Sequence, residues 1–170
     1  MRRMVRTGMA VVLAGGLLAA CGDDDDDAAE DTTTTAEAGE EVACEPVGSG
    51  GTELAVVLDE FSVVPASATA APGAVRFVAD NQGEEPHELV VVRAASPADL
   101  TVEDRQVVED ALPEGDFLGE IEAFPAGETC EGTFELTAGS YVLFCNLVEE
   151  EDGALESHFE EGMQTTLLVQ

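Results

Sequence analysis

The sequence predicts an all-β fold, a Greek-key β-sandwich formed by residues 44–170. Three observations favour this fold: short apolar runs recur, clusters of Gly, Pro, Asn or Ser separate them, and Val, Phe and Thr are frequent within them. Side chains of such strands alternate between two faces, so two antiparallel sheets can share one core. A chain of this length buries about two-thirds of its unfolded surface, which is enough for an independent domain.

The expected strands follow one another at short intervals. They are ELAVVLDEFSVV (53–64), AVRFVAD (74–80), HELVVVRA (87–94), LGEIEAF (118–124), TCEGTFEL (129–136), SYVLFC (140–145) and QTTLLVQ (164–170). Phe134 and Leu136 are expected to face the core, and Thr133 to face water, because successive strand side chains point to opposite faces. The residues TAGS then form the turn to the next strand.

One segment does not fit the strand pattern. Ser96 precedes Pro97, acidic residues follow, and apolar residues then recur at near-helical spacing. A serine before a proline, with acidic residues in the first turn, is typical of a helix N-terminus. We therefore expect a short helical insertion near residues 97–112, ended by Pro113.

The N-terminus resembles an export signal. Three arginines precede an apolar run that is too short to span a bilayer and ends in small residues. The sequence LAAC, Leu18 to Cys21, resembles the cleavage site of bacterial lipoproteins, which implies a signal peptide over residues 1–20 and lipidation of Cys21. The alternative is an ordinary secreted protein with a spare N-terminal cysteine. Either route exports the chain, and lipidation would anchor it to the outer face of the cell membrane.

Residues 21–43 are expected to form a disordered tether after the lipidated cysteine. The segment is rich in Asp, Glu and Thr and offers little apolar surface to offset the entropy cost of ordering. Its charge would keep it extended and hold the domain away from the membrane.

The charge of the chain limits its partners. The formal net charge is −31, with six arginines and no lysine. Such a surface repels nucleic acid and anionic lipid headgroups, so we expect no nucleic-acid partner and no membrane contact except through the lipid anchor. The domain needs no partner to form a core, so a monomer is expected.

Few metal-binding side chains remain after removal of the predicted signal peptide. The histidines are His87 and His158, and the methionine is Met163. His87 begins one expected strand and Cys145 ends another, so a sandwich can hold both at one pole. His158 and Met163 lie in the connection to the last strand and can fold back over that pole.

Two imidazoles, one thiolate and one thioether discriminate between metals. Thiolate and thioether are soft ligands, and a trigonal site of two His and one Cys with a weak axial Met is typical of electron-transfer copper. Zinc makes little use of a thioether, and calcium prefers oxygen ligands. The set therefore predicts one copper ion in a type 1 site. Each residue taken singly has an ordinary structural explanation, as a strand-end or loop residue, a buried thiol or a core side chain.

The segment NQGEEPH (81–87), the strand YVLFC and the sequence HFEEGM followed by QTTLLV resemble the cupredoxins, a family of small blue copper proteins. The resemblance covers residues 53–170. It implies His87, Cys145 and His158 as equatorial copper ligands and Met163 as the axial ligand. It also implies that electrons enter and leave through the edge of His158.

The chain departs from the family pattern in one loop. Twelve residues separate Cys145 from His158, where the best-known cupredoxins have only a few. The closure entropy of a loop grows only logarithmically with length, so the site can still close. The length of this loop weakens any expectation that it is rigid.

The remaining cysteines, Cys44 and Cys130, are expected to form a disulfide. An exported protein can keep one, and the ligand role that the resemblance gives Cys145 leaves this single pairing. The bridge would close a long loop and contribute on the order of 4 kcal/mol. Two free thiols are the alternative.

The sequence thus predicts a protein that carries single electrons between extracytoplasmic redox partners, and not an enzyme. Copper enzymes with related sites need additional copper held by further histidines, and none remain here. The alternatives are a copper-holding or delivery protein of the same fold and a metal-free interaction module.

Acidic residues flank His158 and would steer a basic redox partner toward it, although a solvated loop without a partner is equally consistent with them. They are Glu149, Glu150, Glu151, Asp152, Glu156, Glu160 and Glu161. Leu155 and Phe159 could form an apolar docking rim or belong to the core.

Overall fold

The structure is a computed structural model that describes Cys44, residues 46–151 and residues 153–170. Outside the described residues lie the expected signal peptide (1–20), the lipidation site Cys21, the tether (21–43) and Asp152. Among the described residues, no helix has both the length and the apolar character needed to cross a membrane.

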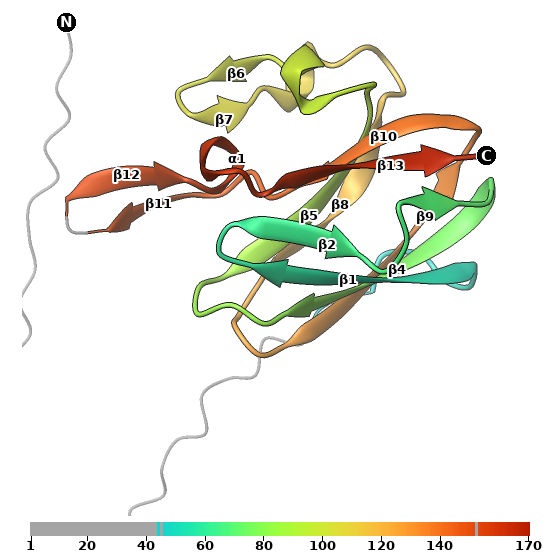
Figure 1. Cartoon of the computed structure of the whole chain (residues 1–170), viewed down its shortest axis with the longest axis horizontal. Coiled ribbons are helices and arrows are strands. Elements are labelled where there is room, and N and C mark those ends of the chain that lie inside the picture. The colour runs from blue at the N-terminus through green and yellow to red at the C-terminus, as the bar shows by residue number, and fades with distance from the viewer. Residues whose placement is uncertain (1–43, 45, 152) are drawn as a thin grey trace, which may run out of the picture. The chain divides into compact units, whose positions relative to one another are not determined.

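Two β-sheets pack face to face, which confirms the predicted sandwich (Figure 1). The first sheet has the order β2–β1–β4–β9, with bounds β1 Thr52–Asp59, β2 Ser62–Pro65, β4 Gly73–Asn81 and β9 Thr129–Leu136. The second has the order β3–β13–β10–β5–β8, with bounds β3 Thr69–Ala70, β5 His87–Arg93, β8 Phe117–Phe124, β10 Gly139–Phe144 and β13 Gln164–Val169.

The sequence suggested antiparallel pairing throughout, but two pairs of strands are parallel. β1 pairs in parallel with β4, and β13 pairs in parallel with β3. The chain leaves the first sheet after β2, adds β3 to the second sheet and returns as β4 in the direction of β1. Parallel neighbours require such a crossover, which the pattern of apolar runs does not reveal.

The first expected strand is in fact a hairpin. The run 53–64 divides into β1 and β2, which pair antiparallel with Asp59 opposite Ser62. Glu60 and Phe61 form the turn between them. This turn lies at the same end of the sandwich as the start of β5 and the end of β10, and it becomes part of the candidate site described below.

Strands β5 and β10 are buried on both faces. Leu89 and Val91 of β5 face the core between the two sheets, whereas Val90 and Val92 face a second apolar cluster outside the second sheet. The run LVVV is therefore apolar without alternation, as expected for a strand covered on both sides. The outer cluster includes Val107 from the insertion after β5.

The insertion contains helical turns, but not one continuous helix. It consists of two 3-10 helices, η1 (Pro97–Asp99) and η2 (Glu109–Ala111), around a hairpin of β6 (Val102–Glu103) and β7 (Gln106–Val107). Ser96 caps η1 by accepting a hydrogen bond at Oγ from the amide of Ala98, at 3.2 Å. The near-helical spacing is misleading because Val107 is buried against the sheet while Val102 stays exposed.

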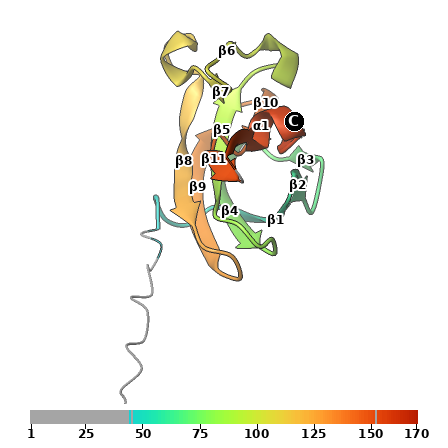
Figure 2. The same ribbon diagram turned by 90° about the vertical axis from the view of Figure 1, so that its left-hand side faces the viewer.

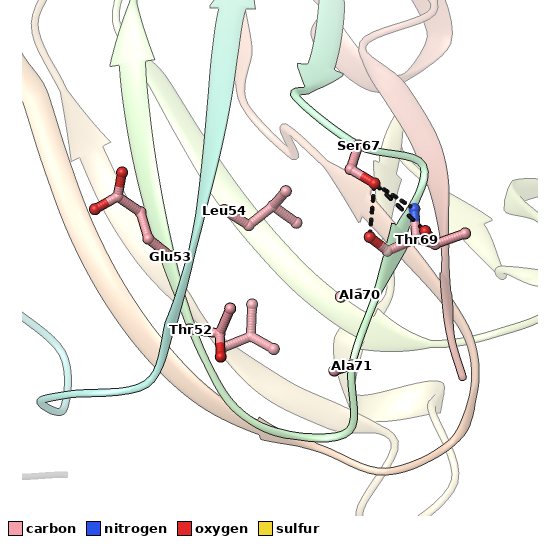
Figure 3. Close-up of a pocket in the computed structure, with 8 residues that line it drawn as sticks. Thr52, Glu53, Leu54, Ser67, Thr69, Ala70 and Ala71 are labelled. Carbon is pink, nitrogen blue, oxygen red and sulfur yellow. Dashed lines mark hydrogen bonds between the residues drawn. The ribbon is translucent and has the colours of Figure 1, made fainter.

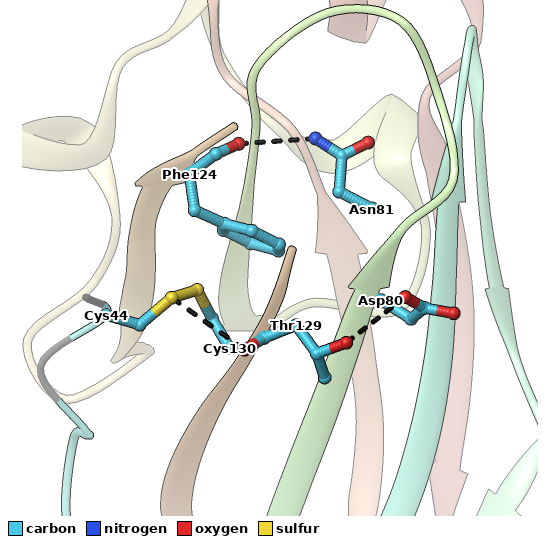
Figure 4. Close-up of a disulfide and its surroundings, with 6 residues drawn as sticks. All are labelled: Cys44, Asp80, Asn81, Phe124, Thr129 and Cys130. Atoms are coloured by element: carbon cyan, nitrogen blue, oxygen red, sulfur yellow. Dashed lines mark hydrogen bonds between the residues drawn. A yellow bond between two sulfur atoms is a disulfide. The ribbon is translucent and has the colours of Figure 1, made fainter. Parts of the chain in front are cut away.

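The expected disulfide joins Cys44 to Cys130, with a Cα–Cα distance of 5.5 Å that is usual for such a bridge (Figure 4). It ties the segment before β1 to β9 in the first sheet. Next to it, the Thr129 hydroxyl donates to the Asp80 carboxylate at 3.2 Å. The bridge therefore fixes the first described residue to β9, the edge strand of the first sheet.

The two ends of the sandwich differ in character. We call the end with the β1–β2 turn, the start of β5 and the end of β10 the ligand pole; Figure 2 looks toward it, with α1 (His158–Glu161) near the centre. A pocket lies at the opposite end, between the start of β1 and β3 (Figure 3). Its lining residues are Thr52, Glu53, Leu54, Ser67, Thr69, Ala70, Ala71 and Val75.

Candidate metal centre

Three of the four predicted ligands converge at the ligand pole. His87 is the first residue of β5, Cys145 directly follows β10, and His158 is the first residue of α1. The Nδ1 atoms of the two histidines are 3.3 Å apart, and Cys145 Sγ is 3.4 Å from His158 Nδ1. The three donor atoms all lie within 4.8 Å of one another.

This spacing fits a single metal ion. Three donor atoms at such separations surround a point about 2.0 to 2.4 Å from each, which is the length of metal bonds to imidazole nitrogen and thiolate sulfur. All three side chains are fully buried, with exposed fractions of 0%. The donors are thus shielded from water and already aimed at one point.

Backbone hydrogen bonds hold Met163 next to two of these three ligands. The Cys145 amide donates to the Met163 carbonyl at 3.1 Å, and the Met163 amide donates to the His158 carbonyl at 2.9 Å. The Met163 side chain is fully buried and belongs to the same core cluster as Cys145. The fourth predicted ligand is therefore placed next to the other three in the fold.

Burial controls the protonation of the donors. Loss of hydration lowers the pKa of His87, against the raising effect of the Glu60 carboxylate, and lowers the pKa of His158 to about 4, with a further contribution from His87. Burial also raises the pKa of the Cys145 thiol to about 12. At neutral pH the histidines are neutral and can bind metal. The thiol is protonated at this pH, so it must release its proton to solvent when a metal ion binds the sulfur.

A short helix positions both His158 and Met163. Ser157 caps α1 by accepting a hydrogen bond at Oγ from the Glu160 amide, at 3.2 Å. The helix ends after one turn at Gly162, whose φ of 113° lies in the left-handed region that glycine adopts without strain. Met163 then starts the path into β13.

The loop before His87 is fixed by Asn81, which is fully buried. Its side-chain amide donates to the carbonyl of Glu85 at 2.8 Å and to that of Phe124 at 3.2 Å, the contact drawn in Figure 4. Its side-chain oxygen accepts from the amide of Gly83 at 3.1 Å. Asn81 therefore shapes the NQGEEPH loop, as an Asx turn does.

The long connection between Cys145 and His158 is an ordered hairpin. It contains β11 (Val148–Glu151) and β12 (Ala154–Ser157), which extend beyond the sandwich in Figure 1. The His158 amide donates to the Leu147 carbonyl at 3.1 Å, which closes the base of the hairpin. The antiparallel pairing of β11 with β12 thus restrains a connection whose length alone suggested a flexible loop.

The insertion holds this connection from the other side. Asn146 accepts at Oδ1 from the Val107 amide at 2.7 Å and donates to the Val107 carbonyl at 3.0 Å. The Ser157 hydroxyl donates to the Arg105 carbonyl at 2.6 Å, and the Arg105 guanidinium donates to the Leu155 carbonyl at 3.1 Å. Both ends of the hairpin are therefore bonded to β6–β7.

Comparison with known proteins gives matches at the level of structure. Auracyanin from the photosynthetic bacterium Roseiflexus castenholzii superposes with a TM-score of 0.51 and 16% identity, covering 71% of this chain and 99% of that one. Auracyanin B gives a TM-score of 0.51 and 24% identity, covering 73% and 93%. No family model and no curated protein sequence matches the chain.

The chain has the cupredoxin fold. This confirms the fold that the NQGEEPH, YVLFC and HFEEGM segments suggested. Within the cupredoxin fold, the converging donors come from the start of β5, the end of β10 and the segment before β13.

Sequence reasoning missed three residues of the site. Glu60 Oε1 lies 3.0 Å from His87 Nε2, Glu85 Oε2 lies 3.5 Å from His158 Nε2, and the Phe61 ring meets His158 edge-on with centroids 5.0 Å apart. Glu60 and Phe61 belong to the β1–β2 turn. The one available signal was the acidic pair Asp59–Glu60, which interrupts the apolar run 53–64.

His158, through whose edge the family resemblance implies that electrons pass, is fully enclosed in this structure. Its exposed fraction is 0%, because Phe61 and Glu85 lie against its outer side. Phe159 is a core residue, packed edge-on against Phe144 at 5.4 Å, whereas Leu155 is 56% exposed. Of the two proposed rim residues, Leu155 alone remains on the surface.

The acidic residues near the ligand pole differ in exposure. Those with exposed side chains are Glu150, Glu160 and Glu161, and those with partly buried side chains are Glu149 and Glu156. Glu85, Glu149 and His158 form a second group of possible ligands within 4.8 Å of one another. This group shares His158 with the first site and lies on the outer side of the same imidazole.

Proposed function

We propose that this protein binds one copper ion in a type 1 site and transfers single electrons between extracytoplasmic redox partners. The proposal names His87, Cys145 and His158 as equatorial ligands and Met163 as the axial ligand. The observation that supports it most strongly is the convergence of two neutral imidazole nitrogens and one buried thiol on a single point. A soft sulfur ligand with two imidazoles favours copper over harder ions.

When bound, copper would supply a one-electron couple between Cu(I) and Cu(II). The residues of the pole would keep the same arrangement in both oxidation states. β5, β10 and α1 hold the three donors by hydrogen-bonded backbone, and the insertion and the β11–β12 hairpin restrain the connection between them. A site that moves little on electron transfer has a small reorganisation cost.

We place the protein outside the cytoplasm and expect its redox partner to be basic. The Cys44–Cys130 disulfide is consistent with an oxidising compartment. Glu160 and Glu161 of α1 and Glu150 of the β11–β12 hairpin expose their side chains. A field of this sign attracts a positive partner and weakens as salt screens it.

The test is copper titration of the purified full chain. We expect one Cu(II) per chain, an intense visible absorption from thiolate-to-copper charge transfer, and a reversible one-electron couple. Cys145→Ser should abolish the absorption band. Met163→Leu is the comparison variant and should keep the band while changing the reduction potential, because the axial ligand tunes that potential.

Three results would contradict the proposal. A colourless chain after copper addition would exclude a thiolate ligand, as would a band unchanged in Cys145→Ser. Tight copper binding without a reversible couple would instead support the copper-holding alternative.

A further inference from the structure

Each histidine of the candidate site has a carboxylate on the side away from the converging donors. Glu60 Oε1 is 3.0 Å from His87 Nε2, and Glu85 Oε2 is 3.5 Å from His158 Nε2. The Nδ1 atoms of the same rings face each other at 3.3 Å. The two carboxylates therefore lie on the Nε2 side of two rings whose Nδ1 atoms point inward.

The Glu60 carboxylate is held in place from outside the site. Its Oε1 atom accepts hydrogen bonds from the amides of Glu84 and Glu85, both at 2.9 Å. These amides belong to the loop that leads into His87, so the β1–β2 turn and this loop fix each other. Both carboxylates lie within ion-pair distance of the imidazoles, but neither His87 Nε2 nor His158 Nε2 makes a hydrogen bond in this geometry.

A neutral imidazole carries one proton, which resides on the nitrogen that has an acceptor nearby. A carboxylate at Nε2 favours the proton on that atom, in competition with an arrangement in which one Nδ1–H donates to the other Nδ1 at 3.3 Å. The thiol of Cys145 can then donate to His158 Nδ1 at 3.4 Å in the metal-free protein. Both Nδ1 lone pairs would be directed at the point that a metal ion would occupy.

We propose that Glu60 and Glu85 are positioning residues that hold His87 and His158 as Nε2–H tautomers and place two negative charges behind the metal ligands. This inference deepens the proposed copper function and rests on it for its consequences in the metal-bound protein. Such partners behind histidine ligands fix the ring orientation and increase ligand basicity. Two carboxylates also favour the more positive oxidation state of a bound metal.

The first experiment needs no metal. Two-bond proton–nitrogen NMR correlations of the metal-free full chain should show both histidines as Nε2–H tautomers. Glu60→Gln should shift His87 toward the Nδ1–H form, because the neutral amide attracts the Nε2 proton less strongly. The glutamine oxygen can still accept from the two loop amides, so the fold should be retained. The control is Glu84→Gln, which removes an exposed neighbouring charge.

The second experiment measures copper. Glu60→Gln and Glu85→Gln should each lower Cu(II) affinity about 10- to 100-fold relative to the wild type. Both should also move the reduction potential upward. Glu84→Gln should change neither quantity by more than about twofold, because its contribution is a screened surface charge.

The outcomes separate this inference from the proposed function. An unchanged His87 tautomer in Glu60→Gln overturns the positioning role, and so do copper affinities equal to that of Glu84→Gln. A chain that shows the tautomer shift but binds no copper contradicts the proposed function and supports the positioning role.

Discussion

His158 shows how burial prepares a single residue for metal binding. The ring is enclosed by Phe61, Glu85 and the second histidine, so hydration of its charged form is lost. This loss of hydration is the main reason that its pKa falls to about 4, and repulsion by His87 lowers the pKa further. The residue therefore stays neutral over the physiological pH range and keeps a lone pair available.

The free energy of unfolding of the metal-free protein should fall as the pH drops from about 6.5 to 4. In this window His158 takes up a proton only when unfolded, because its folded pKa is about 4 and its unfolded pKa is about 6.5. The shift corresponds to a loss of up to about 3 kcal/mol. Urea unfolding followed by circular dichroism over this range measures it.

Two variants make this measurement specific. His158→Gln should reduce the acid sensitivity and leave the part that comes from His87, whose pKa burial also lowers. Glu88→Gln removes an opposite contribution, because burial raises the pKa of Glu88 to about 7 and the folded chain then gains stability from protonating it on acidification. A Glu88→Gln protein whose stability is constant between about pH 6.5 and 4 would contradict the account of His158.

At the scale of elements, the insertion and the β11–β12 hairpin depend on each other. β6–β7 covers the outer face of β5 and β10 through Val107. The Val107 amide also donates to the side chain of Asn146, the residue after Cys145. Arg105 adds a bond to the Leu155 carbonyl in β12. The long connection, which sequence reasoning treated as a flexible loop, is therefore held on two sides.

Asn146→Ala should destabilise the protein by about 2 kcal/mol, because the buried Val107 amide loses its acceptor. Urea unfolding of the metal-free protein measures the change. The matched control is Gln106→Ala, which loses only the bond from an exposed side chain to the Asn146 carbonyl. Equal losses in the two variants would show that the Asn146 side chain has no special role.

At the scale of the whole molecule, one covalent bridge and a large negative charge oppose each other. The disulfide closes a loop between residues 86 positions apart and reduces the entropy of the unfolded chain. The chain carries 37 acidic residues against six arginines, so like charges repel more strongly in the compact state.

Replacing Cys44 and Cys130 together by alanine should lower the free energy of unfolding by about 4 kcal/mol, since the unfolded chain regains the entropy of the open loop. Chemical denaturation of the wild type with and without reductant provides a second measurement. Reductant should destabilise the wild type and leave the double variant unchanged. A wild type that resists full reduction without loss of stability would contradict this expectation.

Sodium chloride should raise the melting temperature of the metal-free protein, with most of the gain below about 1 M, where the Debye length falls to about 3 Å. Screening of repulsion among the carboxylates is the cause. A variant with Glu150 and Glu161 replaced by glutamine should start from a higher melting temperature and gain less from salt; Glu160 is kept because it lies 3.5 Å from the Arg105 guanidinium. Identical salt responses of the two proteins would assign the effect to something other than these charges.

The site residues were predictable to different extents. His87, Cys145, His158 and Met163 could be selected from sequence because few residues of their types exist in the chain and each lies at the end of an expected strand or in the connection to the last one. The geometry brings the first three donors together and places Met163 beside them. Glu60, Phe61 and Glu85 could not be selected, because nothing distinguishes them from the many other acidic and apolar residues until the β1–β2 turn is placed against the loop before β5.

The sequence by itself determined the sandwich, its strands and the available ligand chemistry, because alternation of apolar residues and the supply of side chains are local properties. Tertiary structure decided the parallel pairing of β1 with β4, the hairpin within 53–64, the two 3-10 helices of the insertion and the burial of His158. These features depend on contacts between segments distant in sequence, whose free energy is gained only when both partners are in place.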